Sequence, residues 1–164
     1  MTVVSNTSPI VNLAVVGKLE LLRDLYGRVI VPEAVYHEIA VRGQGQPGAL
    51  ELQTWSCFQT RPATDKALVA QLEQDLDPGE AEAIALAVQL SADTLLIDER
   101  RGRTVAARFS VPVTGLLGVL VLAKRRGLLA AVKPVLDHLK AKAGFYIRGD
   151  LYTRVLQSVD ESSS

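Results

Sequence analysis

Residues 3–10 read Val-Val-Ser-Asn-Thr-Ser-Pro-Ile, and this stretch decides the fold class. The two valines predict a short buried strand, because β-branched side chains pack well in sheets. An apolar helical pattern begins at Pro9, and Thr7 or Ser8 is the expected N-cap of that helix. The strand therefore passes directly into a helix, which leaves Asn6 just beyond the carboxyl end of the strand.

The same alternation of strand and helix continues along the chain. Further strands are predicted at residues 28–31, 55–60, 94–97 and 111–113. Helices are predicted at residues 19–25, 32–39, 64–76, 77–90, 100–109, 115–123, 128–139 and 150–159. This alternation predicts an α/β fold: a three-layer α/β/α sandwich with a central, mostly parallel sheet and extra C-terminal helices.

The bulk composition bounds the class of protein. A chain of 164 residues with 48% hydrophobic residues is expected to form one globular domain with a substantial core. No run reaches about 18 consecutive apolar residues, and no basic segment precedes an apolar one at the N-terminus, so neither a membrane span nor a secretory signal is expected. The single cysteine, Cys57, excludes an internal disulfide and a cysteine-rich zinc site. A reducing, cytoplasmic location is the expectation.

Charge is unevenly distributed, although 18 basic residues balance 18 acidic ones. Residues 1–98 hold 6 Lys or Arg against 13 Asp or Glu, a net −7, and residues 99–164 hold 12 against 5, a net +7. This division indicates either a carboxylate site beside a phosphate-binding face, or ordinary scatter with basic surface helices.

Four polar residues are candidates for one site at the edge of the sheet: Asn6, Glu38, Glu80 and Asp98. Parallel sheets place their sites beyond the carboxyl ends of the strands, and oxygen ligands gathered there suit Mg²⁺ or Mn²⁺. Each residue also has a local explanation. Glu80 completes a capping box with Asp77, Asp98 caps the following arginine-rich helix, Asn6 forms an Asx turn, and Glu38 is an exposed helix residue.

Four blocks of sequence together resemble the PIN-domain fold, in the branch related to VapC-type toxin ribonucleases. The blocks are VVSNTSPI (3–10), PEAVYHEI (32–39), GEAEAIALA (79–87) and LLIDERRGR (95–103). Their order and spacing match the family over residues 1 to about 125. The resemblance implies a Mg²⁺- or Mn²⁺-dependent ribonuclease that gathers its acidic residues at one end of a parallel sheet.

Carried over by position, the family's four acids fall on Asn6, Glu38, Glu80 and Asp98 as catalytic residues. The resemblance implies that the last three are the metal ligands. Candidate helpers are Thr7, Ser8, Glu82 and Glu99.

The first position departs from the family pattern, because an asparagine stands where an aspartate is usual. An amide offers one neutral oxygen to a cation, so Asn6, Glu38, Glu80 and Asp98 together carry about three negative charges rather than four. A Mg²⁺ site often needs only one or two protein carboxylates. We therefore expect metal binding to survive in a weaker form, and the substitution puts the strength of catalysis in doubt.

Basic and aromatic residues of the second half bear on nucleic-acid binding. Arg100, Arg101 and Arg103 directly follow the Asp98–Glu99 pair and are the expected contacts to RNA phosphates, unless they form a solvated helix face. Phe145, Tyr146 and Tyr152 either stack on a base or pack within the protein.

The chain is expected to divide into a PIN-like domain at 1–143, a helical extension at 144–159 and a disordered tail at 160–164. The apolar stripe of residues 128–139 indicates an extra layer on the core or an interface. The resemblance implies a homodimer and a small antitoxin protein as partners. The extension is then packed on, or exchanged with, a partner.

Two functions remain open at this point. The first, implied by the resemblance, is an endoribonuclease that hydrolyses RNA phosphodiester bonds with a metal-activated water, as the toxin of a toxin–antitoxin pair. The second is a catalytically weak or inactive PIN-like module that binds nucleic acid or a protein partner. A receiver-like phospho-acceptor domain is disfavoured, because no pair of acids follows the first strand. Nucleotide-dependent enzymes are disfavoured by the absence of a glycine fingerprint.

Overall fold

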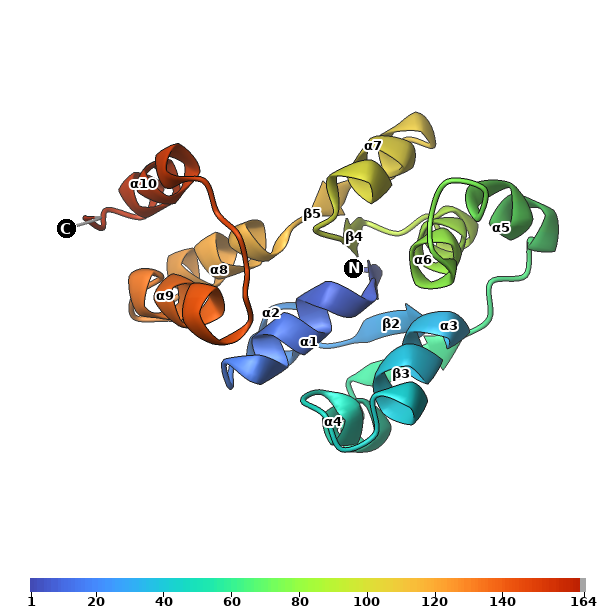
Figure 1. Ribbon diagram of the computed structural model, residues 1–164, viewed down its shortest axis with the longest axis horizontal. Coiled ribbons are helices and arrows are strands. Elements are labelled where there is room, and N and C mark those ends of the chain that lie inside the picture. The colour runs from blue at the N-terminus through green and yellow to red at the C-terminus, as the bar shows by residue number, and fades with distance from the viewer. Residues whose placement is uncertain (163–164) are drawn as a thin grey trace.

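A five-stranded, entirely parallel sheet forms the centre of the protein in the computed structural model, which describes residues 1–162 (Figure 1). The strands are β1 (Val3–Ser5), β2 (Val29–Pro32), β3 (Phe58–Arg61), β4 (Thr94–Leu96) and β5 (Val113–Thr114). Their order across the sheet is β3-β2-β1-β4-β5. The strand sequence therefore runs outward in both directions from β1, and the order reverses between β1 and β4.

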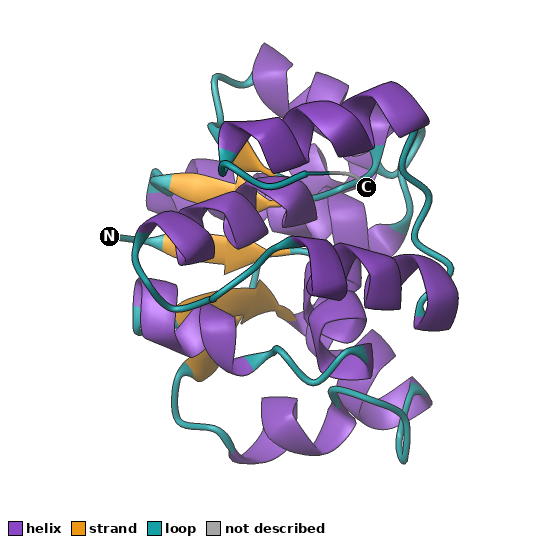
Figure 2. Cartoon of the chain, turned by 90° about the vertical axis from the view of Figure 1, so that its left-hand side faces the viewer, coloured by secondary structure: helices purple, strands orange, loops and turns teal. Residues whose placement is uncertain are grey.

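Helices cover both faces of this sheet (Figure 2). They are α1 (Thr7–Val15), α2 (Glu20–Tyr26), α3 (Glu33–Tyr36), the π-helix η1 (His37–Arg42), α4 (Ala49–Thr54), α5 (Lys66–Leu72), α6 (Pro78–Leu90), α7 (Arg100–Arg108), α8 (Leu116–Arg125), α9 (Lys133–Lys142) and α10 (Gly149–Ser158). The predicted three-layer α/β/α sandwich with a parallel sheet is confirmed.

Successive residues of a strand pack into two separate hydrophobic cores, because neighbouring side chains point to opposite faces of the sheet. Val3 and Leu96 belong to a core shared with α1, α2, α8, α9 and α10, whereas Val4 and Leu95 belong to a core shared with α5, α6 and α7. In Figure 1, α8, α9 and α10 gather at one end of the molecule, and α5 and α6 lie at the other. Because both faces of the sheet are covered, β1, β2 and β4 are buried along their whole length, whereas residues 59–61 of the edge strand β3 are polar and exposed.

Several helices differ from the sequence-based expectation. Helix α1 begins at Thr7 with Asn6 as its N-cap, not with Thr7 or Ser8, and Asn6 makes no side-chain capping bond. Helix α5 ends at Leu72 instead of residue 76, and α4 forms at Ala49–Thr54, where no helix was predicted.

Helix α9 begins at Lys133 rather than at residue 128. Pro134 stands in its first turn, where a missing N–H costs nothing, and it would interrupt a helix that started one turn earlier. The Glu161 carboxylate accepts hydrogen bonds from the backbone N–H groups of Val132 (2.7 Å) and Lys133 (3.0 Å), and so caps the helix at this position.

The C-terminal segment is tied to the rest of the chain as far as Glu161. Leu156 on α10 is fully buried in the core that α8 and α9 share. Glu161 lies within the stretch 160–164 expected to be disordered, yet it accepts the two bonds described above and forms an ion pair with Lys124 at 2.8 Å. Residues 163–164 of that tail lie outside the described residues. None of the helices in residues 1–162 has the length and apolar character needed to cross a bilayer.

Candidate functional site

The reversal of strand order between β1 and β4 brings two polar chain segments together. Ser5 pairs with Leu96 across the two strands, and the Asn6 N–H donates to the Leu96 carbonyl at 2.9 Å. Asn6 and the Asp98–Glu99 pair therefore leave the sheet side by side at its carboxyl edge. Parallel sheets form their ligand sites at this kind of topological switch point.

Asn6 is buried, with 3% of its surface exposed. Its side-chain Nδ2 donates to Glu99 Oε2 at 3.2 Å, which explains why the amide does not cap α1. The amide thus binds one carboxylate through its donor side and keeps a neutral oxygen at the edge of the sheet.

Glu38 reaches the same edge from η1. Its Oε2 accepts a hydrogen bond from the Thr7 hydroxyl at 2.8 Å, which ties η1 to the first turn of α1. The same oxygen lies at the start of α6, where a Cβ added to Gly79 would stand 3.3 Å from it. The absence of a side chain at Gly79 leaves room for this carboxylate at a helix N-terminus, where negative charge is favoured.

Glu80 forms the predicted capping box of α6. The Asp77 carboxylate accepts from the Glu80 N–H at 2.8 Å, and Glu80 Oε1 accepts from the Asp77 N–H at 3.2 Å. The other oxygen, Oε2, faces α7, where a Cβ at Gly102 would stand 3.3 Å from it. The capping role therefore uses one carboxylate oxygen and leaves the second directed at the neighbouring helix.

Burial raises the pKa of Glu80 from 4.5 to about 7, and the negative charges of Asp77 and Glu99 act in the same direction. Only 8% of the residue is exposed, so water compensates its charge poorly. The Glu99 contribution also shows that Glu99 stands close enough to Glu80 to repel it. Glu99 therefore interacts with both residues: it accepts a hydrogen bond from Asn6, and its charge acts on Glu80.

Asp98 caps α8 rather than the arginine-rich helix that follows it. Its Oδ1 accepts from the Leu116 N–H at 2.7 Å, whereas α7 has Glu99 as its N-cap, without a side-chain capping bond. Burial raises the pKa of Asp98, the hydrogen bond from Leu116 opposes that rise, and the Glu99 charge adds to it. The Asp98 carboxylate is thus held in place by a helix start 18 residues away in sequence.

The second oxygen of Asp98 has no hydrogen-bond partner within residues 1–162. The Ser8 hydroxyl lies beside the carboxylate and favours its charged form, but the geometry falls short of a hydrogen bond. Ser8 Oγ and Asp98 Oδ2 are both buried without a hydrogen-bond partner among the described residues. Buried polar atoms are nearly always satisfied, so an orphaned carboxylate oxygen indicates a place for a cation or an ordered water.

Two of the remaining candidates have other contacts. Glu82 Oε1 accepts from the Ala34 N–H at 3.1 Å, so the Glu82 carboxylate serves the first turn of α3. Arg103 Nη1 donates to the Ile97 carbonyl at 3.5 Å, and a Cβ at Gly115 would stand only 2.5 Å from that nitrogen. Arg100 and Arg101 are exposed at the start of α7.

The carboxylates lie near one edge of the sheet but do not form a preformed metal site. Within residues 1–162, no group of three or more acidic, histidine or cysteine side chains is arranged so that it could hold a metal ion. The reason is visible in the hydrogen bonds, since Glu38, Glu80, Asp98 and Glu99 each bind a different donor. Repulsion between like charges also keeps carboxylates apart when nothing positive stands between them.

Sequence reasoning missed the glycines that shape this edge and the capping of α8 by Asp98. Gly79 makes room for Glu38 and Gly115 makes room for Arg103, whereas Gly102 makes room first for Ile97, at 2.6 Å, and then for Glu80, at 3.3 Å. No local pattern marks these contacts, because each joins segments that are distant in sequence.

Comparison with known proteins agrees with this architecture. Residues 2–161 match the PIN domain family, a match that runs from β1 through the end of α10. No curated protein matches the chain. PIN domains are generally nucleases. Because the match spans nearly the whole sequence, this chain belongs to the PIN-domain family.

Proposed function

We propose that this protein is a metal-dependent endoribonuclease of the VapC-type branch, with an asparagine variant of the usual site. The observation that carries the proposal is the meeting of Asn6, Glu99 and Asp98 at the β1–β4 switch point, where a buried Asp98 oxygen has no hydrogen-bond partner among residues 1–162. Glu38 and Glu80 reach the same edge from η1 and α6. Membership of the PIN-domain family supports hydrolysis of nucleic acid.

The residues present fit a hard divalent cation. All the charged donors are carboxylates, which Mg²⁺ and Mn²⁺ prefer, and Asp98 Oδ2 has an unused acceptor position. The raised pKa of Glu80 points the same way, because a nearby cation would offset the cost of its buried charge.

Glu38, Glu80 and Asp98 are the proposed metal ligands. When bound, Mg²⁺ or Mn²⁺ supplies a Lewis acid that polarises a phosphoryl oxygen and generates a nucleophilic water. The Thr7 hydroxyl orients Glu38, the Leu116 N–H orients Asp98, and the capping box orients Glu80. Arg100, Arg101 and Arg103 hold the phosphates of the substrate strand.

Glu99 compensates for the neutral residue at position 6. Because the Asn6 amide donates to Glu99, it holds a fourth carboxylate at the edge without adding a charge of its own. With Glu38, Glu80 and Asp98, this returns the number of carboxyl groups at the edge to four. An aspartate at position 6 would instead face Glu99 as a second carboxylate across 3.2 Å, which is unfavourable without a cation.

The proposal extends to a cytoplasmic toxin that forms a homodimer and is controlled by a small antitoxin protein. Its support is the resemblance to the VapC-type branch. Induced expression should arrest bacterial growth, and Asp98→Asn should abolish the arrest. Continued arrest with that variant would contradict the toxin assignment.

Cleavage of labelled single-stranded RNA with Mn²⁺ tests the nuclease proposal directly. Asp98→Asn is the informative variant, because its amide oxygen can still accept the Leu116 N–H while the charge is lost. The matched control is Asp75→Asn, which removes an exposed carboxylate beyond α5. We expect loss of cleavage with the first variant only, and cleavage that survives Asp98→Asn overturns the proposal.

A non-catalytic PIN-like binding module is the second candidate. The observation that favours it is the separate engagement of each carboxylate by its own hydrogen-bond donor, with no ready three-ligand group in residues 1–162. Calorimetry separates the two candidates, because this one predicts no Mn²⁺ binding at micromolar to millimolar concentrations.

A further inference from the structure

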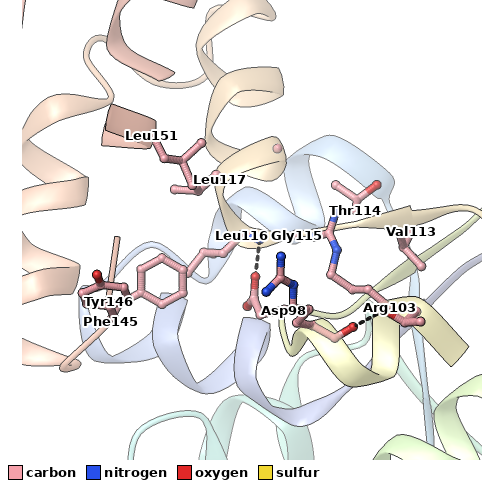
Figure 3. A pocket seen from close by; sticks show the side chains of 13 residues that line it. Asp98, Arg103, Val113, Thr114, Gly115, Leu116, Leu117, Phe145, Tyr146 and Leu151 are labelled. Carbon is pink, nitrogen blue, oxygen red and sulfur yellow. Dashed lines mark hydrogen bonds between the residues drawn. The ribbon is translucent and has the colours of Figure 1, made fainter. Parts of the chain in front are cut away.

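A cleft of about 860 Å³ opens beside Asp98, which is one of the residues that line it (Figure 3). One wall is formed by the starts of α7 and α8, and the other by the segment that joins α9 to α10 and by Leu151. This volume lies within the range of ligand pockets, roughly 300–1,000 Å³. The cleft is thus continuous with the candidate site and large enough to hold part of a substrate.

The end of the cleft nearest Asp98 is cationic. Arg100 and Arg103 line it, and neither forms an ion pair with a carboxylate in the part of the chain that the structure describes. Gly115 lines the same end and leaves the space that the Arg103 guanidinium occupies. These guanidinium groups are therefore available to bind an anion.

The other end is apolar and carries an exposed aromatic ring. Phe145, Leu117 and Leu151 line it with Tyr146, and 83% of Tyr146 is exposed. Figure 3 shows Phe145 and Tyr146 across the cleft from Arg103, with Leu151 and Leu117 nearby.

The backbone on both sides of Tyr146 is anchored. Gly144 adopts a positive φ of 64° at the end of α9, and the Phe145 N–H donates to the Leu139 carbonyl at 3.0 Å. Ile147 is buried, with 7% of its surface exposed. Tyr146 is therefore an exposed ring on a fixed backbone, which lowers the entropy that a partner must remove on binding.

We propose that this cleft binds an unpaired nucleotide of the substrate strand, with its base stacked on Tyr146 and its phosphate held by Arg100 and Arg103. Guanidinium groups at one end and an aromatic face at the other match the two chemistries of a single-stranded nucleic acid. The inference rests on the proposed function, because it assigns the substrate strand a path from the carboxylates to Tyr146. It follows that a duplex, whose bases are already stacked and paired, binds this surface less well.

Binding to a fluorescein-labelled 12-nucleotide RNA tests the inference without any cleavage. Anisotropy is measured in EDTA for the RNA alone and for the same strand annealed to its complement. Tyr146→Ala is expected to weaken single-strand binding at least about fivefold, the effect of losing one stacked base, and Tyr146→Phe to retain it. Leu50→Ala is the matched control, since Leu50 on α4 is also an exposed apolar residue, at 67% exposure.

The arginines have their own comparison. Arg103→Gln should weaken binding of the single strand, whereas Arg125→Gln, at the far end of α8 roughly 14 Å along that helix, should not. As a direct readout, ultraviolet cross-linking to 5-iodouridine in the same RNA should attach to Tyr146, as identified by mass spectrometry.

If Tyr146→Ala binds single-stranded RNA as tightly as the wild-type protein does, the inference is wrong. The cleft would then have a different occupant, such as an apolar peptide. Equal affinity for duplex and single strand overturns it as well. These results are separate from the nuclease assay. If the protein cleaves RNA but Tyr146→Ala does not change its affinity for single-stranded RNA, only this inference is refuted. Binding that depends on Tyr146 without any cleavage refutes only the catalytic proposal.

Discussion

Replacing Glu80 with glutamine should stabilise the metal-free protein above neutral pH. Glutamine keeps an oxygen that can accept the Asp77 N–H, now bonded at 3.2 Å to Glu80 Oε1, and removes the buried charge. Burial raises the pKa of Glu80 from its ordinary 4.5 to about 7 in the folded chain. Folding therefore favours the protonated carboxyl group.

The sign and size follow from linkage. The stabilising contribution of the protonated group is complete below pH 4.5 and is lost as the pH rises through 7. At about 1.4 kcal/mol per pKa unit, the folded wild-type protein loses up to about 3 kcal/mol over this window. Glu80→Gln does not undergo this loss, so its advantage should grow from near zero at pH 4.5 to about 3 kcal/mol at pH 8.

Urea denaturation in EDTA at several pH values between 4.5 and 8 measures this difference. Glu73→Gln is the control, because it replaces an exposed carboxylate and should change stability by no more than about 0.5 kcal/mol. Repeating the series in Mn²⁺ should shrink or reverse the advantage of Glu80→Gln, since the wild-type charge then has a cation to bind. A variant that is equally or less stable than wild type at pH 8 in EDTA would refute the reasoning about the buried charge.

Three further changes probe the same architecture. Asn6→Asp should lower the melting temperature of the metal-free protein and tighten Mn²⁺ binding in calorimetry, and adding Glu99→Gln should restore the stability. An unchanged melting temperature would show that the Asn6–Glu99 bond is unimportant. Gly115→Ala places a Cβ 2.5 Å from the Arg103 guanidinium, so it should weaken single-stranded RNA binding while urea denaturation changes little; unaltered affinity would argue against a role for that guanidinium. Glu161→Ala removes an ion pair and two backbone bonds, and should lower the free energy of unfolding by about 1–3 kcal/mol, whereas no loss would mean that the C-terminus adds nothing to stability.

Local patterns in the sequence were sufficient for the elements and for one part of the site. The strand at Val3 and Val4, the helix predicted at residues 19–25 and the capping box of Asp77 and Glu80 were all predictable. Each depends on side-chain periodicity or on hydrogen bonds between residues a few positions apart. The parallel α/β/α fold followed from the alternation of these elements.

The contacts that build the site were decided only by tertiary structure. Asp98 caps α8 rather than α7, and Asn6 binds Glu99 across 93 residues rather than capping α1. The start of α9 likewise depends on Glu161, 28 residues away from Lys133.

The physical reason is the same in each case. A polar side chain near a helix start can bond to a partner within its own turn or to a partner that is distant in sequence. Sequence spacing describes only the local partner. The order of the strands decides which of the distant partners comes within hydrogen-bond distance. In this protein that order places β1 against β4, so the residues that follow these two strands meet, and Tyr146 comes to line a cleft that begins at Asp98.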